Sequence, residues 1–144
     1  MLISKKNGFI FIHIYKNAGS SITHALTPFS TTQGRMMLNR FFRRFGVKYF
    51  DHRPYPDHIT AQELIRQLSG KVFKNYFSFA FVRNPWDWQV SLYSYMRKNA
   101  DHHQHDLSMQ FSSFKEYIRW RCANEVVLQK SFICDEHDSI LVDY

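Results

Sequence analysis

The stretch FIFIHIYKNAGSSITHAL, residues 9–26, decides the fold. Its first part, Phe9 to Ile14, alternates β-branched and aromatic residues, a pattern typical of a buried strand. Small residues follow the lysine at position 16, and Ser20 to Leu26 is predicted to form a short helix that the Thr27-Pro28 step ends. A strand, a tight lysine-containing turn and a helix are therefore expected in direct succession.

Later segments repeat this alternation. Thr60 to Leu68 is predicted to be a helix, because Thr60 can cap it and Glu63 completes a capping box. Tyr76 to Val82 is predicted to be a strand, followed by a helix with Asn84 as its cap and Pro85 at its first position. A helix over 114–128 and a last strand over 140–142 complete the expected elements.

The order of these elements predicts an α/β fold with a mainly parallel sheet flanked by helices. A chain of 144 residues is expected to form a single domain, 1–144. Ligands of such sheets bind at the carboxyl ends of the strands. Two segments with chemically useful side chains lie at such ends.

The composition favours anionic partners, because the formal net charge is +7. Two cysteines, Cys122 and Cys134, indicate a reduced intracellular chain. Lys5 and Lys6 precede an apolar run too short for a signal peptide, and no stretch has the roughly 20 apolar residues of a membrane span. We expect a cytoplasmic protein with no transmembrane segment.

The first candidate site is the segment from Lys16 to Ile22. The amides of Gly19 to Ile22 are expected to point outward, unpaired, from a helix N-terminus, where they can bind an anion. Gly19 can adopt a positive φ, Ser20 and Ser21 add hydroxyl donors, and Lys16 adds a positive charge. This is not a Walker A loop, since the lysine precedes the glycine. The alternative is a tight turn with a surface lysine.

The second candidate site contains Arg83, at the end of the second strand, and Ser91, two turns into the next helix. Arg83 can bind two oxygens of a phosphate at once, and Ser91 can donate to the same group. The alternative is an arginine paired with Asp87 and a serine on the helix surface. Together the two sites indicate a ligand with two anionic groups.

The two segments also resemble a known family. HIYKNAGSS (13–21) and FVRNPWDWQVSLY (81–93) resemble HxPKTAGTS and FVRNPxxRxxSxY, the motifs of sulfotransferases that use 3′-phosphoadenosine 5′-phosphosulfate (PAPS), and they are most similar to the carbohydrate branch. Order and spacing are kept, and ILVDY (140–144) resembles the family's next core strand. Tyr15 replaces the usual proline, and Trp88 and Gln89 replace commonly basic or aliphatic residues.

The resemblance implies a P-loop-like nucleotide-binding core that moves a sulfuryl group to a hydroxyl or amine of an acceptor, with a carbohydrate suggested by resemblance alone. Lys16 would neutralise the charge on the leaving phosphate, and no metal is required. The residues that would bind the 5′-phosphosulfate are Lys16, Asn17, Ala18, Gly19, Ser20, Ser21 and Ile22. Arg83 and Ser91 would hold the 3′-phosphate. The product would be adenosine 3′,5′-bisphosphate.

A histidine is expected to accept the proton of the acceptor. His58 is the first candidate and His52 the second, with a surface or capping role as the alternative for each. His13 is expected to pack against the loop or orient it. The histidines of DHHQHD (101–106) are interpreted as a solvated loop and not as metal ligands.

Several questions stay open in the sequence. RMMLNRFFRRF (35–45) indicates either a helix with a charged, solvated face or a surface for a polyanion, a membrane or RNA. Either Trp86 or Trp88 could stack on adenine, or both could be core. The alternative function is a non-catalytic module that binds a nucleotide or polyanion, with nucleic acid the less favoured partner. Family domains usually exceed 144 residues, so we expect a short member or one truncated at its C-terminus.

Overall fold

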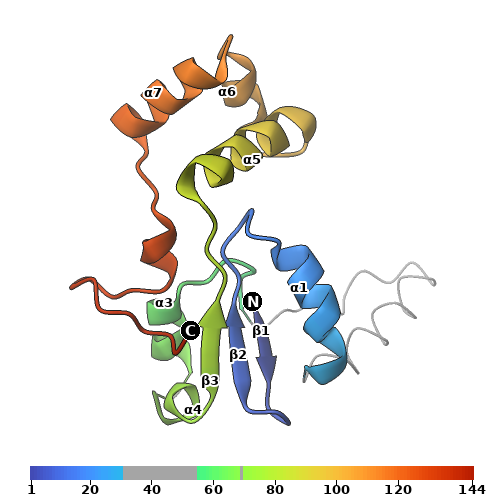
Figure 1. Ribbon diagram of the computed structural model, residues 1–144, viewed down its shortest axis with the longest axis vertical. Helices are drawn as coiled ribbons and strands as arrows, with labels where there is room; N and C mark the ends of the chain where they lie inside the picture. The colour runs from blue at the N-terminus through green and yellow to red at the C-terminus, as the bar shows by residue number, and fades with distance from the viewer. Residues whose placement is uncertain (31–54, 69) are drawn as a thin grey trace. The chain divides into compact units, whose positions relative to one another are not determined.

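The computed structural model describes residues 1–30, 55–68 and 70–144. These residues form two compact units, each described here by itself (Figure 1). Unit 1 comprises Met1–Phe81 and Lys130–Tyr144, and unit 2 comprises Val82–Gln129. That the whole chain, 1–144, forms a single domain stays a prediction.

Unit 1 is built on a three-stranded sheet in the order β1 (Leu2–Ser4), β2 (Phe9–Ile12), β3 (Phe77–Ala80). β1 and β2 are antiparallel, whereas β2 and β3 are parallel. The α/β class is confirmed, but the sheet is mixed. The sequence did not predict β1, because three residues are too few to show an alternating pattern.

The expected strand over 140–142 is wrong in its bounds. Ile140 forms an isolated bridge with Cys134. Pairing with β3 begins one residue after the expected end of the strand, where the Asp143 amide donates to the Ser78 carbonyl at 2.9 Å. The Tyr144 amide donates to the same carbonyl, and the Ala80 amide donates to the Tyr144 carbonyl. This pair of bonds is the pattern of a parallel ladder, and it lies on the edge of β3 that faces away from β2.

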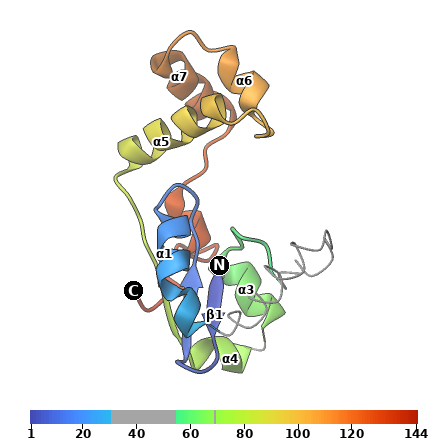
Figure 2. The same cartoon turned by 90° about the vertical axis from the view of Figure 1, so that its right-hand side faces the viewer.

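The two faces of the sheet carry different side chains. Phenylalanines on alternate positions of β2 and β3 pair directly, with Phe9 opposite Phe77 and Phe11 opposite Phe79. The rings of Phe11 and Phe79 lie 5.5 Å apart. The alternating positions, Ile10 and Ile12, are fully buried. Figures 1 and 2 show α1 on one side of the sheet and the α3–α4 pair on the other.

The helices of unit 1 largely follow the local sequence signals. They are α1 (Gly19–Leu26), η1 (Thr27–Phe29), α3 (Ala61–Gln67) and α4 (Gly70–Lys74). The predicted cap of α3 is confirmed, since the Thr60 hydroxyl accepts a hydrogen bond from the Glu63 amide at 3.1 Å. Helix α3 buries Ala61 and Leu64. A short 3-10 helix, η2 (Gln129–Phe132), begins at the last residue of unit 2.

Unit 2 consists of α5 (Pro85–Lys98), α6 (His105–Met109) and α7 (Phe114–Asn124). Asn84 caps α5 as predicted: its side chain accepts from the amides of the helix's second and third residues. Trp88, Leu92 and Met96, spaced at helical intervals of four residues, form the buried face of α5. Helix α7 ends four residues before the predicted end at 128, because the β-branched pair Val126-Val127 is unfavourable in a helix.

Two further findings concern the chain's environment. No helix within residues 1–30, 55–68 and 70–144 is long and apolar enough to cross a membrane. Cys122 and Cys134 are both free thiols. The basic aromatic segment 35–45 and the second candidate base, His52, lie outside the described residues.

Candidate functional site

The loop between β2 and α1 has an unusual backbone. Lys16 (φ 62°) and Ala18 (φ 57°) both adopt the left-handed conformation. Residues other than glycine seldom adopt it, because it costs on the order of 1–2 kcal/mol per residue, and such strain gathers at functional sites. The expectation that Gly19 supplies the positive φ of this turn is wrong, since the turn is made by its neighbours.

Gly19 is needed for a different reason. A Cβ built on Gly19 would lie 1.7 Å from Nε2 of His13, so the imidazole occupies the space that any other residue would need. Gly19 is also buried at the first position of α1. The contact confirms that His13 packs against the loop. The glycine therefore lets α1 begin directly beside the strand end.

The N-terminus of α1 exposes main-chain donors. Its cap is Ala18, which has no polar side chain and makes no capping hydrogen bond. The Ile22 amide donates to the Ala18 carbonyl at 3.0 Å, so the expected outward-pointing amide at Ile22 is wrong. The amides of Gly19, Ser20 and Ser21 precede this first helical bond, and the described residues supply no acceptor for them. Ser20 and Ser21 are exposed, so these donors suit an anion from solution.

Asn17 anchors the loop instead of pointing into solvent. Its side chain is 5% exposed, and its Nδ2 donates to the Phe81 carbonyl at 2.8 Å. This bond ties the loop to the residue that follows β3. Any contact of Asn17 with a nucleotide would therefore use its main chain. The sequence offered no signal for this anchor, because the two residues are 64 positions apart.

His58 lies beside the same loop. Its Nδ1 is 3.0 Å from the His13 carbonyl oxygen, and the two imidazole rings meet edge to face with centroids 4.5 Å apart. The Tyr15 ring packs against His58 at 5.8 Å, and against Phe132 at 5.5 Å. The residue that replaces the family's usual proline therefore helps to hold the candidate base.

The hydrogen bond of His58 assigns its tautomer. A carbonyl oxygen can accept but not donate, so Nδ1 carries the proton, and Nε2 of the neutral ring keeps its lone pair. Nε2 has no hydrogen-bond partner in the part of the chain that the structure describes, and the side chain is exposed. His58 is thus arranged to accept a proton at Nε2.

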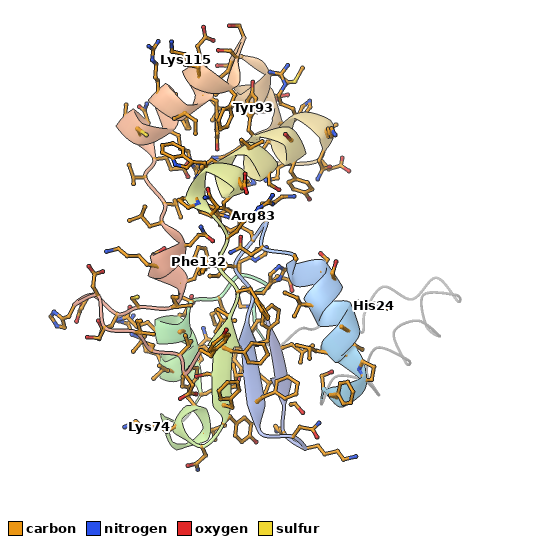
Figure 3. The ribbon with its side chains drawn as sticks, in the orientation of Figure 1. His24, Lys74, Arg83, Tyr93, Lys115 and Phe132 are labelled. Carbon is orange, nitrogen blue, oxygen red and sulfur yellow. The ribbon has the colours of Figure 1, made fainter. Side chains whose placement is uncertain are left out.

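The second candidate site lies in unit 2. Figure 3 shows Arg83 at the start of α5, where its side chain is exposed. Among the described residues its guanidinium forms no ion pair with Asp87, the partner that the alternative interpretation required. Ser91 is half-buried on α5. The structure therefore groups the loop, His13 and His58 in unit 1, and Arg83 with Ser91 in unit 2.

The main chain of Arg83 has a partner that the sequence did not reveal. The Arg83 amide donates to Oε1 of Gln129 at 2.9 Å, and Nε2 of Gln129 donates to the Arg83 carbonyl at 2.8 Å. The structure also separates the two tryptophans nearby. Trp88 is 2% exposed and belongs to the core, whereas Trp86 is 68% exposed and remains a candidate to stack on a base.

The interpretation of 101–106 as a solvated loop is wrong in part, because His105 and Asp106 begin α6 and the side chains of His102 and His105 are half-buried. Nδ1 of His105 is 2.8 Å from the Met96 carbonyl, and the rings of His102 and His103 stack at 4.4 Å. The described ranges, 1–30, 55–68 and 70–144, contain no group of three or more His, Cys, Asp or Glu side chains placed to hold a metal ion.

Comparison with known proteins gives the family. A family model described as "Sulfotransferase family" matches residues 1–140. The chain belongs to the sulfotransferase family. The match covers both candidate sites of this sulfotransferase and implies a transferase activity, while the branch and the acceptor stay unresolved. No curated protein and no solved structure matches the chain.

Proposed function

We propose that this sulfotransferase moves a sulfuryl group from PAPS to a hydroxyl or amine of an acceptor. The observation that carries the proposal is the N-terminus of α1: three amides without acceptors among the described residues follow a strained, lysine-containing loop. A helix N-terminus of this kind is a suitable site for a phosphate or sulfate group. The family match supports the sulfuryl donor over other anions.

Lys16 and the start of α1 would hold the 5′-phosphosulfate of the donor. The amides of Gly19, Ser20 and Ser21 donate to its oxygens, and the two serine hydroxyls add to them. Lys16 neutralises the negative charge that builds on the phosphate as the sulfur–oxygen bond breaks. Asn17, Ala18 and Ile22 shape this site through the main chain and the packing of the loop.

Arg83 and Ser91 would bind the 3′-phosphate, which distinguishes PAPS from common adenine nucleotides. The exposed guanidinium can donate two parallel hydrogen bonds to a phosphate. This assignment follows the two-site interpretation of the sequence, in which one ligand carries two anionic groups. PAPS is a co-substrate in this proposal, and no metal takes part.

His58 would act as the general base. As the acceptor oxygen or nitrogen attacks sulfur, its proton passes to Nε2 of His58, while the bond between sulfur and the bridging oxygen breaks. The products are the sulfated acceptor, adenosine 3′,5′-bisphosphate and a protonated His58. The bond from Nδ1–H to the His13 carbonyl keeps the ring in the required tautomer.

Two further proposals concern the acceptor class and the cellular location. A carbohydrate acceptor rests on the likeness of the two motifs to the carbohydrate branch, and a cytoplasmic location rests on the sequence alone. The second candidate function is a non-catalytic module that keeps the anion sites. The net charge of +7 favours it, because such a module would bind polyanions chiefly through summed basic charge.

Transfer from sulfur-labelled PAPS to a panel of glycan, phenol and amine acceptors tests the proposal. Lys16→Ala should lower turnover by about 10²–10³ while much of the bisphosphate affinity is kept. His58→Ala should lower turnover by about 10²–10⁴. Lys74→Ala and His24→Ala are matched controls, since both residues are exposed in unit 1 and lie outside the loop (Figure 3). Failure of all acceptors, with salt-sensitive binding of polyanions, would favour the binding module.

A further inference from the structure

The side chain of Gln129 binds both main-chain polar groups of Arg83, as a neighbouring strand would. Its carboxamide accepts from the Arg83 amide at 2.9 Å and donates to the Arg83 carbonyl at 2.8 Å. Two bonds from one planar group to one residue restrain both backbone dihedrals of that residue. The two residues are 46 positions apart: Arg83 is the second residue of unit 2, and Gln129 is its last.

Arg83 needs such a restraint, because it belongs to no helix or strand. It lies between the end of β3 at Ala80 and the start of α5 at Pro85. On its carboxyl side, Asn84 fixes the chain by capping α5 at the amides of the first turn. Gln129 supplies the corresponding restraint at Arg83 itself, so the Cα–Cβ direction of the arginine is set from both sides.

We propose that Gln129 is a positioning residue for 3′-phosphate binding. The proposal rests on the proposed function, in which Arg83 binds that phosphate. Gln129 reaches the nucleotide through Arg83: by fixing the backbone, it lowers the conformational entropy that the arginine loses when the guanidinium engages two phosphate oxygens. A carboxamide is suited to the task, because it offers one donor and one acceptor in a single plane.

The choice of residue makes the proposal testable. Methionine has nearly the shape of glutamine but can replace neither bond. Asparagine keeps the carboxamide, but its side chain is one methylene shorter, so the carboxamide lies farther from both main-chain groups of Arg83. A matched control is Gln104→Met in the same unit, since Nε2 of Gln104 donates to Glu125 at 3.1 Å and not to Arg83.

The experiment is calorimetric titration of the full chain with adenosine 3′,5′-bisphosphate and with 5′-AMP. Gln129→Met should weaken bisphosphate binding about 3- to 10-fold, because the backbone of Arg83 is no longer held in place for the 3′-phosphate. The affinity for 5′-AMP should not change, because 5′-AMP has no 3′-phosphate. In an Arg83→Ala background, Gln129→Met should have no further effect. Gln104→Met should match the wild type for both nucleotides.

The outcomes separate this inference from the proposed function. If the wild type prefers the bisphosphate and Arg83→Ala removes that preference, the function stands. Gln129→Met with an unchanged preference, or with an equal loss for both nucleotides, would then overturn the positioning role alone. A wild type without any preference would overturn both. Should Gln129→Met not fold, as judged by circular dichroism, the same ratio measured for Gln129→Asn decides the question.

Discussion

Gly19 offers a sharp test of the loop geometry, because two opposing effects act on its replacement by alanine. In a helix, alanine is favoured over glycine by up to about 1 kcal/mol, so without other effects the change would stabilise the protein. The added Cβ would, however, lie 1.7 Å from Nε2 and 1.8 Å from Cδ2 of His13. The imidazole would have to move by more than a bond length, although His58 and Phe11 flank it. Overpacking of this kind costs about 1–3 kcal/mol.

We therefore expect Gly19→Ala to lower the free energy of unfolding by about 1–2 kcal/mol. In a His13→Ala background the obstacle is gone, and Gly19→Ala should be neutral or stabilising. The matched control is Gly8→Ala, where a Cβ meets nothing within 4 Å and φ is +63°. Its cost of about 1 kcal/mol arises from backbone strain alone, so it should not depend on residue 13.

Urea unfolding followed by far-UV circular dichroism measures these differences. All three tryptophans lie in unit 2, whereas Gly19, Gly8 and His13 lie in unit 1, so tryptophan fluorescence follows the unfolding of unit 2 beside the signal of the whole chain. A Gly19→Ala variant as stable as the wild type would refute the close contact. Equal costs of Gly19→Ala in both backgrounds would refute the role assigned to His13.

Three further predictions concern other parts of the two units. Thr60→Ala should lower stability by about 1 kcal/mol in urea unfolding, because the capping bond of α3 is lost. Trp88→Ala should cost about 3–5 kcal/mol, whereas Trp86→Ala should stay within about 0.5 kcal/mol, since Trp88 is buried and Trp86 exposed; circular dichroism melts of both variants compare them. Hydrogen bonds from the amide and hydroxyl of Ser78 lower the pKa of Asp143. Because the pKa of Asp143 is lower in the folded state, its carboxylate stabilises the folded protein fully above the ordinary pKa of an aspartate. This stabilisation is lost as the pH falls through the lowered pKa. Asp143→Asn should remove this acid-dependent loss, and amide exchange at Ser78 between about pH 5 and 2 measures it.

Local signals in the sequence predicted the elements that local interactions hold. The caps at Thr60 and Asn84 are bonds to amides two or three residues away, and the buried stripe of α5 follows from helical spacing. The predicted beginnings of these helices are therefore correct. Strand β1 is too short to show an alternating pattern, and Tyr144 pairs with β3, a partner far along the chain, so no local pattern revealed either of them.

In the candidate site, too, the sequence predicted the features that local residues set and missed those that surrounding residues set. The sequence predicted which segment lies after β2, and that His13 packs there. It could not predict that Lys16 and Ala18 take the positive φ, because the turn is fixed by what surrounds it: the His13 ring over Gly19 and the buried anchor of Asn17. A glycine in a turn suggests a positive φ, but a close contact is the other reason for a glycine.

Long-range polar contacts escaped sequence reasoning altogether. The bonds from Asn17 to Phe81 and from Gln129 to Arg83 span 64 and 46 residues, and each uses a common amide side chain with no motif around it. Each contact holds a segment that the sequence identified as a candidate site: the loop before α1 in one case and Arg83 in the other. In this sulfotransferase the motifs contain the groups proposed to bind the donor, and unremarkable residues elsewhere hold those groups in position.

We propose that one phosphate group of the nucleotide binds at Lys16 and the N-terminus of α1, and the other at Arg83 and Ser91. The most direct measurement is calorimetric titration of the wild type with adenosine 3′,5′-bisphosphate, adenosine 5′-phosphate and adenosine 3′-phosphate under identical salt. We expect the bisphosphate to bind about 10- to 100-fold more tightly than either monophosphate, because each phosphate adds charge-assisted hydrogen bonds of its own. Equal affinity for all three nucleotides would contradict it.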